Sequence, residues 1–220
     1  MQIPSRIVLS CVGLLLIGCS SAPKLMPTPN IYAGGGSYPE SSVPSDLKNS
    51  EVDLLFVTDR APETSTDGTL GYGTERSASA GFGSAIVEIG SGLTWQQLVE
   101  MSQTSARSSS PAIRVPSRTE LGRVPPTPHP CRVIDGELSE DPEILAEYDR
   151  VVAEFRRELN RRMQQTRYNE VHIFVHGFNN SFDWAAASLA EVWHFLGRRG
   201  VPLLYSWPAA HGGLFGYFVD

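Results

Sequence analysis

The chain has 220 residues, enough for one sizeable folded core, and its 24 acidic and 18 basic side chains give a net charge of −6. An acidic chain without a basic run is a poor candidate for nucleic-acid binding or for electrostatic attachment to anionic lipid. Composition therefore excludes these function classes without indicating one.

The first 18 residues predict a secretory leader. Arg6 supplies a positive start, residues 7–17 are apolar, and the run ends in Leu-Ile-Gly-Cys at Cys19. The apolar run is shorter than the roughly 20 residues that a transmembrane helix needs. Its ending resembles the lipobox of bacterial lipoproteins, which implies cleavage before Cys19 and acylation of its sulfur. With Ser20 next, the resemblance implies anchoring in the lipid bilayer of the bacterial cell envelope, at the outer membrane. The alternative is an ordinary leader with a chance cysteine.

Residues 19–50 are rich in Ser, Pro and Gly and show no periodicity, so we predict a flexible, disordered tether. The composition changes at Glu51, where the apolar run 52–57 predicts the first strand of a domain over 51–220.

Glycines at 71–73 and 81–83 predict a loop, and residues 84–89 predict the next strand. Residues 112–115 are a weaker strand candidate within an irregular excursion over 102–136 that is dense in Ser and Pro. Cys131 lies in this excursion. With Cys11 in the leader and Cys19 acylated, we expect no internal disulfide and interpret Cys131 as a loop residue rather than a nucleophile.

A helix is predicted after Asp141, which can cap it, with Pro142 in its first position and apolar residues at helical spacing as far as Met163. Glu158 and Arg162 lie one turn apart, and we expect them to form a weak pair on a solvated face.

The pattern then changes to strand, helix, strand. Residues 171–175 predict a central parallel strand covered on both faces, residues 182–196 a helix capped by Asn180 or Ser181, and residues 201–207 another buried strand. We expect Ala186, Leu189, Trp193 and Leu196 to face inward, with Gly197 ending the helix. This order predicts an α/β fold with a mostly parallel sheet and flanking helices. A parallel sheet that stops here has an open apolar edge, so we expect aggregation or dependence on a partner.

The sequences Phe174-Val-His-Gly-Phe-Asn-Asn-Ser-Phe182 and Tyr205-Ser-Trp-Pro208 resemble the core of a family of α/β-hydrolase-fold proteins of unknown function. Tyr72-Gly73 and Arg76-Ser77 also fit the family pattern. The resemblance spans about residues 51–220 and implies a serine esterase or lipase-like activity on an ester substrate. It also implies that the catalytic Ser, Asp and His all follow the second sequence block.

Several residues are candidates for a site. In such a fold the backbone N–H of Phe178, after Gly177, is one of two donors to the oxyanion of an acyl-transfer intermediate, and His176 supports the loop. Asp59 and Arg60 are possible cleft residues, although an ion pair that fixes the Tyr72 loop is equally plausible.

Other residue types give weaker candidates. His172 and His176 are separated by roughly 13 Å along a strand, so no metal site is predicted, and no cofactor is expected. Ser206 lacks the glycine-flanked turn of a nucleophile elbow.

No Gly-x-Ser-x-Gly sequence occurs at any of the 20 glycines. We therefore expect a truncated ester hydrolase that carries the oxyanion half of the site and is inactive or nearly so. The alternative is a non-catalytic envelope lipoprotein that acts as a binding or scaffold module. The oligomeric state is left open.

Overall fold

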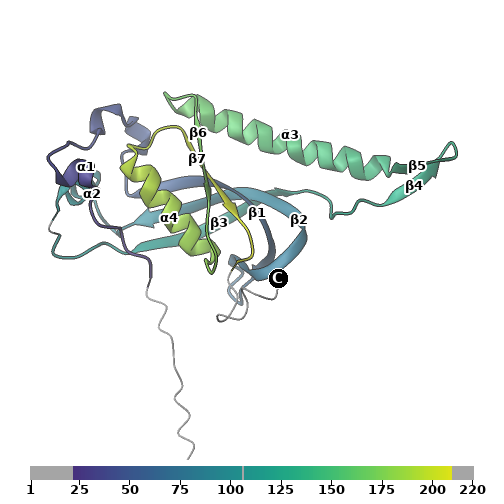
Figure 1. Ribbon diagram of the computed structural model, residues 1–220, viewed down its shortest axis with the longest axis horizontal. Helices are drawn as coiled ribbons and strands as arrows, with labels where there is room; N and C mark the ends of the chain where they lie inside the picture. The colour runs from purple at the N-terminus through teal and green to yellow at the C-terminus, as the bar shows by residue number, and fades with distance from the viewer. Residues whose placement is uncertain (1–21, 106, 210–220) are drawn as a thin grey trace, which may run out of the picture.

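In the described part of the chain, a five-stranded sheet with helices packed against it forms the body (Figure 1). The computed structural model describes residues 22–105 and 107–209, so the predicted leader, Cys19 and residues 210–220 lie outside the described residues. Strand order is β3-β2-β1-β7-β6; the β1–β7 and β6–β7 pairs are parallel, and the β1–β2 and β2–β3 pairs are antiparallel. The α/β class is confirmed, with a mixed sheet. The elements are α1 (Asn30–Ala33), η1 (Glu40–Ser42), η2 (Ser45–Leu47), β1 (Glu51–Thr64), β2 (Leu70–Ile89), α2 (Trp95–Gln103), β3 (Ile113–Arg123), β4 (Cys131–Ile134), β5 (Glu137–Glu140), α3 (Pro142–Gln165), β6 (Val171–Val175), α4 (Phe182–Phe195) and β7 (Val201–Ser206).

The first two strands are longer than predicted. The prediction of a loop at the glycines of 71–73 and 81–83 was wrong, because these residues lie inside β2. Gly83 has a packing reason: a Cβ there would lie 2.0 Å from the carbonyl oxygen of Thr119 and 2.6 Å from the Phe56 ring. Glycine in a strand thus marks a close approach by a neighbouring strand rather than a break in the sheet.

The excursion predicted over 102–136 contains a regular edge strand. β3 pairs with β2 from Ile113 to Arg123, although it includes Pro116. An edge strand tolerates proline, because one side of it needs no backbone donor. A short hairpin follows, in which β4 and β5 are joined by Asp135 and Gly136 at φ of 54° and 84°. These positive values are typical of a tight hairpin turn.

The segment before β1 packs on the body, so the flexible tether predicted over 19–50 was wrong for residues 22–50. Leu25, Tyr32, Tyr38 and Val43 are buried in the main core. The hydroxyls of Tyr32 and Tyr38 donate to the carbonyls of Phe195 and His194, at 2.7 and 2.9 Å. Because helix ends leave carbonyls unpaired, these tyrosines fix the segment and complete the end of α4 together.

The main core lies between the sheet and α4. Alanines at 185, 186, 187 and 190 are all buried and let the helix approach the strands closely. Leu196 was predicted to face inward, but it caps the end of α4 and its side chain is 47% exposed. Gly197, at φ +76°, turns the chain away there, which is why the inward pattern stops one residue early.

Helix α3 contacts β3 and β7, and its far end projects with the β4–β5 hairpin (Figure 1). Asp141 caps it by accepting from the Glu143 N–H, as the sequence predicted. The Glu158–Arg162 pair forms at 2.7 Å, but its predicted solvation was wrong. Arg162 is buried and also donates to the Asp53 carboxylate at 2.9 Å.

Strand β6 was predicted to be covered on both faces, and this was wrong. It is the edge strand of the described sheet, with Ile173 and Val175 exposed to 65% and 58%. Apolar composition predicts what a strand can bury, whereas its position in the sheet decides what it does bury.

Candidate functional site

The turn 176–181 lies where β6 ends and α4 begins. β6 runs parallel to β7, and β7 parallel to β1, so the carboxyl ends of three strands share one edge of the sheet. Ser181 starts α4, and its hydroxyl accepts from the Trp184 N–H at 3.2 Å. In α/β sheets this edge is where ligands bind.

His176 is buried at the base of the turn, and both of its ring nitrogens are engaged. Nε2 lies 3.2 Å from the Trp207 N–H and 3.1 Å from Ser206 Oγ, and Nδ1 lies 2.9 Å from the Gly177 carbonyl. A backbone N–H can only donate, so Nε2 accepts, and the proton is on Nδ1 and goes to Gly177. Burial, opposed by the bond to Gly177 and reinforced by Arg60, lowers the His176 pKa. The neutral ring therefore links β7 to the turn.

Further hydrogen bonds hold the turn. They are made by a side chain of the turn itself and by the backbone that follows β7. The Asn180 amide donates to the carbonyls of Gly177 and Phe178 at 3.2 and 3.3 Å. The Asn179 N–H donates to Ala209 O at 2.8 Å, with Asn179 itself in the left-handed region at φ 58°. These contacts restrain the backbone of the turn at Gly177, Phe178 and Asn179.

Arg60 is buried, and its side chain bonds the turn and two other segments. Its guanidinium donates to Ser206 Oγ at 2.9 Å, to Asn180 O at 2.7 Å and to Gly73 O. Burial lowers its pKa, and the nearby Asp59 opposes this shift. The three partners belong to β7, the turn and β2, so one side chain sets their relative positions.

Asp59 and Arg60 are placed differently from each other. Asp59 pairs with Arg76 rather than with Arg60, and its Oδ1 atom is buried without a hydrogen-bond partner among the described residues. The predicted Tyr72 loop is part of strand β2, and Arg60 holds the strand there by donating to the carbonyl of Gly73.

Ser206 lies between Arg60 and His176 and contacts both side chains. Sequence reasoning missed this link. Its Oγ accepts from Arg60 and can donate to His176 Nε2, and its side chain is fully buried. A Ser–His distance of 3.1 Å suits a nucleophile and its base. Here, however, the other ring nitrogen faces a backbone carbonyl rather than a carboxylate, and Oγ has no open side. The only sequence signal was a polar residue at the end of an apolar strand.

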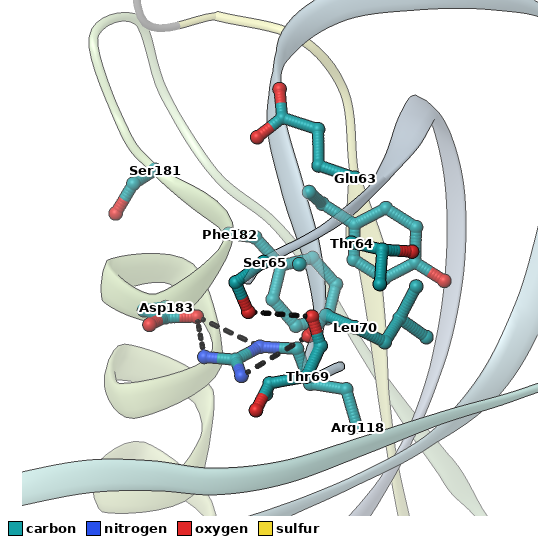
Figure 2. Close-up of a pocket in the computed structure, with 11 residues that line it drawn as sticks. Glu63, Thr64, Ser65, Thr69, Leu70, Arg118, Ser181, Phe182 and Asp183 are labelled. Atoms are coloured by element: carbon teal, nitrogen blue, oxygen red, sulfur yellow. Dashed lines mark hydrogen bonds and ion pairs between the residues drawn. The ribbon is translucent and has the colours of Figure 1, made fainter. Parts of the chain in front are cut away.

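A cavity of about 370 Å³ lies next to the turn (Figure 2). Arg118 donates to the carboxylate of Asp183 in the first turn of α4, and its guanidinium lies 5.9 Å from the centre of the Phe182 ring. The buried rings of Phe182 and Tyr72 provide an apolar wall, with centroids 4.9 Å apart. The full lining is Glu63, Thr64, Ser65, Thr69, Leu70, Gly71, Tyr72, Arg118, Ser181, Phe182 and Asp183.

Phe178 and Gly177 form the exposed tip of the turn. The Phe178 side chain is 39% exposed, and a Cβ added to Gly177 would meet no described atom within 4 Å. Among the described residues, none occupies the space beside the Gly177 Cα.

The structure does not bring the other polar candidates into this site. His172 lies beside Glu170 near the start of β6, at 3.5 Å, and Cys131 is an exposed free thiol at the start of β4. The part of the chain that is described contains no group of three side chains arranged to hold a metal ion. None of its helices has the length and apolarity to cross a bilayer.

Comparison with known proteins agrees with this architecture. No curated protein and no solved structure matches the chain significantly. Residues 152–220, which include β6, the turn, α4 and β7, match the model of the family "Alpha/beta hydrolase of unknown function (DUF900)". The match covers less than half of the chain and supports an α/β-hydrolase family for the segment that contains the turn.

Proposed function

We propose that this chain carries the oxyanion-binding half of a carboxylic ester hydrolase site. The observation that supports it is the turn 176–181, which lies at the carboxyl edge of the sheet and is restrained by Arg60, His176 and Asn180. Oxyanion stabilisation requires donors that are already fixed before charge develops, because reorganising them would cost part of the benefit.

In this proposal the backbone N–H of Phe178 is one of two donors to the tetrahedral intermediate of acyl transfer. The second donor belongs to the residue that follows the nucleophile. His176 is neutral, shares its proton with Gly177, and positions the turn rather than moving protons. Loss of one oxyanion donor typically lowers the rate by about 100- to 1000-fold.

No serine of this sequence is assigned as the nucleophile. Gly-x-Ser-x-Gly does not occur in the 220 residues, and Ser206 is buried and bonded to Arg60. We therefore propose that the 220-residue chain is inactive or nearly so towards esters.

The cavity beside the turn is the proposed binding place for part of the ester substrate. It touches the turn through Ser181, and its apolar wall of Phe182 and Tyr72 suits a short hydrocarbon group. Arg118, held by Asp183, adds one polar group that can orient a carbonyl or an alcohol.

We also propose that a lipid on Cys19 anchors the protein in the bacterial cell envelope, at the outer membrane. Leu25 is buried, so about six residues join the anchor to the core, a reach of roughly 20 Å. The domain would then stay close to the bilayer. Metabolic labelling with an alkynyl palmitate tests this, with Cys19→Ser as the control that should lose the label.

The alternative is a non-catalytic envelope module. The exposed Ile173 and Val175 on edge strand β6 favour it, because such an edge can bind another chain.

A fluorophosphonate probe and a short p-nitrophenyl ester distinguish the two functions. The 220-residue chain is compared with a chain that includes any coding sequence following Asp220. We expect labelling and hydrolysis only in the extended chain, and a strong loss of hydrolysis, with labelling retained, when Gly177→Val narrows the open tip of the turn. Labelling of the 220-residue chain that disappears in Ser206→Ala would overturn the proposal and identify Ser206 as the nucleophile. No labelling of either chain would favour the binding module.

A further inference from the structure

Helix α3 carries an apolar stripe that the sheet leaves partly exposed. Leu145, Val152 and Leu159 recur every seven residues and form this stripe. Leu145 is 37% exposed, and the other two are half-buried. The helix contacts the sheet with an adjacent face, on which Val151 is buried and Phe155 packs edge-on against Phe82 at 5.4 Å. Residues seven apart fall on the same side of a helix, as the apolar contact residues of paired helices do.

The charged residues of α3 fall into two groups. On the side away from the apolar stripe they pair within the helix: Arg150 bonds Glu147 and Glu154, and Arg161 bonds Glu158. Asp149 and Arg156 flank the stripe instead. Both are exposed, and neither forms an ion pair with any described residue.

We propose that α3 is a self-association surface and that its occupant is a second copy of this chain, packed antiparallel with Val152 on the two-fold axis. In this register Leu145 of one copy lies opposite Leu159 of the other, since each is seven residues from Val152. Asp149 precedes Val152 by three residues and Arg156 follows it by four, so Asp149 of each copy meets Arg156 of its partner. The apolar residues and the charges of this surface are therefore self-complementary, as a two-fold interface requires.

The surroundings of α3 leave room for this partner. Its first turns and the β4–β5 hairpin project away from the sheet (Figure 1). Val133 and Leu138, which pair across the hairpin, are 72% and 75% exposed, so the hairpin next to α3 also carries uncovered apolar side chains.

The expected dimer is weak. From Leu145 to Met163 the stripe side of α3 is roughly 27 Å long at 1.5 Å per residue. Even with both hairpins, such a contact falls at the low end of specific interfaces, below about 1,200 Å² in total. We expect dissociation in the micromolar range, where sedimentation velocity resolves monomer and dimer.

Charge exchange tests the register in the full chain. Asp149→Arg and Arg156→Asp, each alone, should weaken the dimer at least about tenfold, because like charges then meet twice across the axis. The double variant should regain the dimer, and so should an equimolar mixture of the two single variants, in which each changed charge meets its opposite. Val152→Glu should give a monomer. Arg157→Glu, on the other side of α3, is the matched control and should dimerise normally.

Melting curves of each variant show whether it folds, and the regained dimer in the mixture cannot come from misfolding. A chain that sediments as a monomer up to the highest soluble concentration would overturn the proposal. So would a dimer that persists in Val152→Glu and Asp149→Arg but is lost in Ile173→Lys, which would place the contact on the β6 edge.

Discussion

Replacing Arg60 by methionine tests whether one buried side chain holds the turn. Arg60→Met keeps most of the volume and removes the donors to Ser206, Asn180 and Gly73. A hydrogen bond from a charged donor contributes about 1.5–3 kcal/mol, so three give a gross loss of roughly 5–9 kcal/mol. Methionine carries no charge, so the variant no longer has the desolvation cost of a buried guanidinium, which is several kcal/mol. The net destabilisation is then about 3–5 kcal/mol.

For a domain of this size the loss corresponds to a decrease in Tm of about 10 °C. Denaturant titration measures the free energy of unfolding, and hydrogen exchange reports separately on residues 176–181, which should lose protection more than β2 does. Arg199→Met is the matched control. Arg199 is half exposed and pairs with Glu170 at the surface, so its removal should cost no more than about 1 kcal/mol. Equal losses in the two variants, or an unchanged midpoint for Arg60→Met, would refute the role assigned to Arg60.

Three further outcomes follow from the structure. Burial, aided by nearby arginines, lowers the pKa values of His176 and His194. The unfolded chain therefore binds protons at these histidines below about pH 6.5, whereas the folded state binds them only at a lower pH. Stability is therefore full above that pH and decreases as the pH falls below it, and unfolding midpoints at about pH 7.5 and 5.5 should show a smaller loss in His194→Gln. Gly83→Ala should destabilise by about 2 kcal/mol or more, because its Cβ would lie 2.0 Å from a carbonyl oxygen, whereas Gly177→Ala should melt like the parent chain. Ser181→Ala should cost about 1 kcal/mol by removing the cap of α4, and an unchanged melt would show that the cap is not needed.

Local patterns in the sequence predicted the elements around the turn well. Asp141 and Pro142 start α3, and residues 171–175 form β6 as predicted. These signals depend on residues within a few positions of one another, which helix caps and apolar periodicity encode directly.

The failures concern contacts between distant residues. Gly83 is typical of a loop when only its sequence neighbours are considered, but the residue that requires a glycine there is Thr119 of the neighbouring strand β3. Tyr32 and Tyr38 lie in a segment whose composition indicates a tether, yet their hydroxyls bond the end of α4, more than 150 residues away. The link between Arg60 and Ser206 spans 146 residues, and no spacing rule connects them.

The same separation determines when the turn can form during folding. Arg60 reaches Ser206 only after β1 and β7 have paired, and it reaches Asn180 only after β6 has added to them. Each of these contacts closes a loop of more than 100 residues, and the entropy cost of closure comes before the contact can stabilise the chain. We therefore expect these contacts to form slowly and late in folding. A partly folded chain would therefore expose Arg60, His176 and Ser206 as unrelated polar groups, and it would acquire the rigid turn in the same step as its complete sheet.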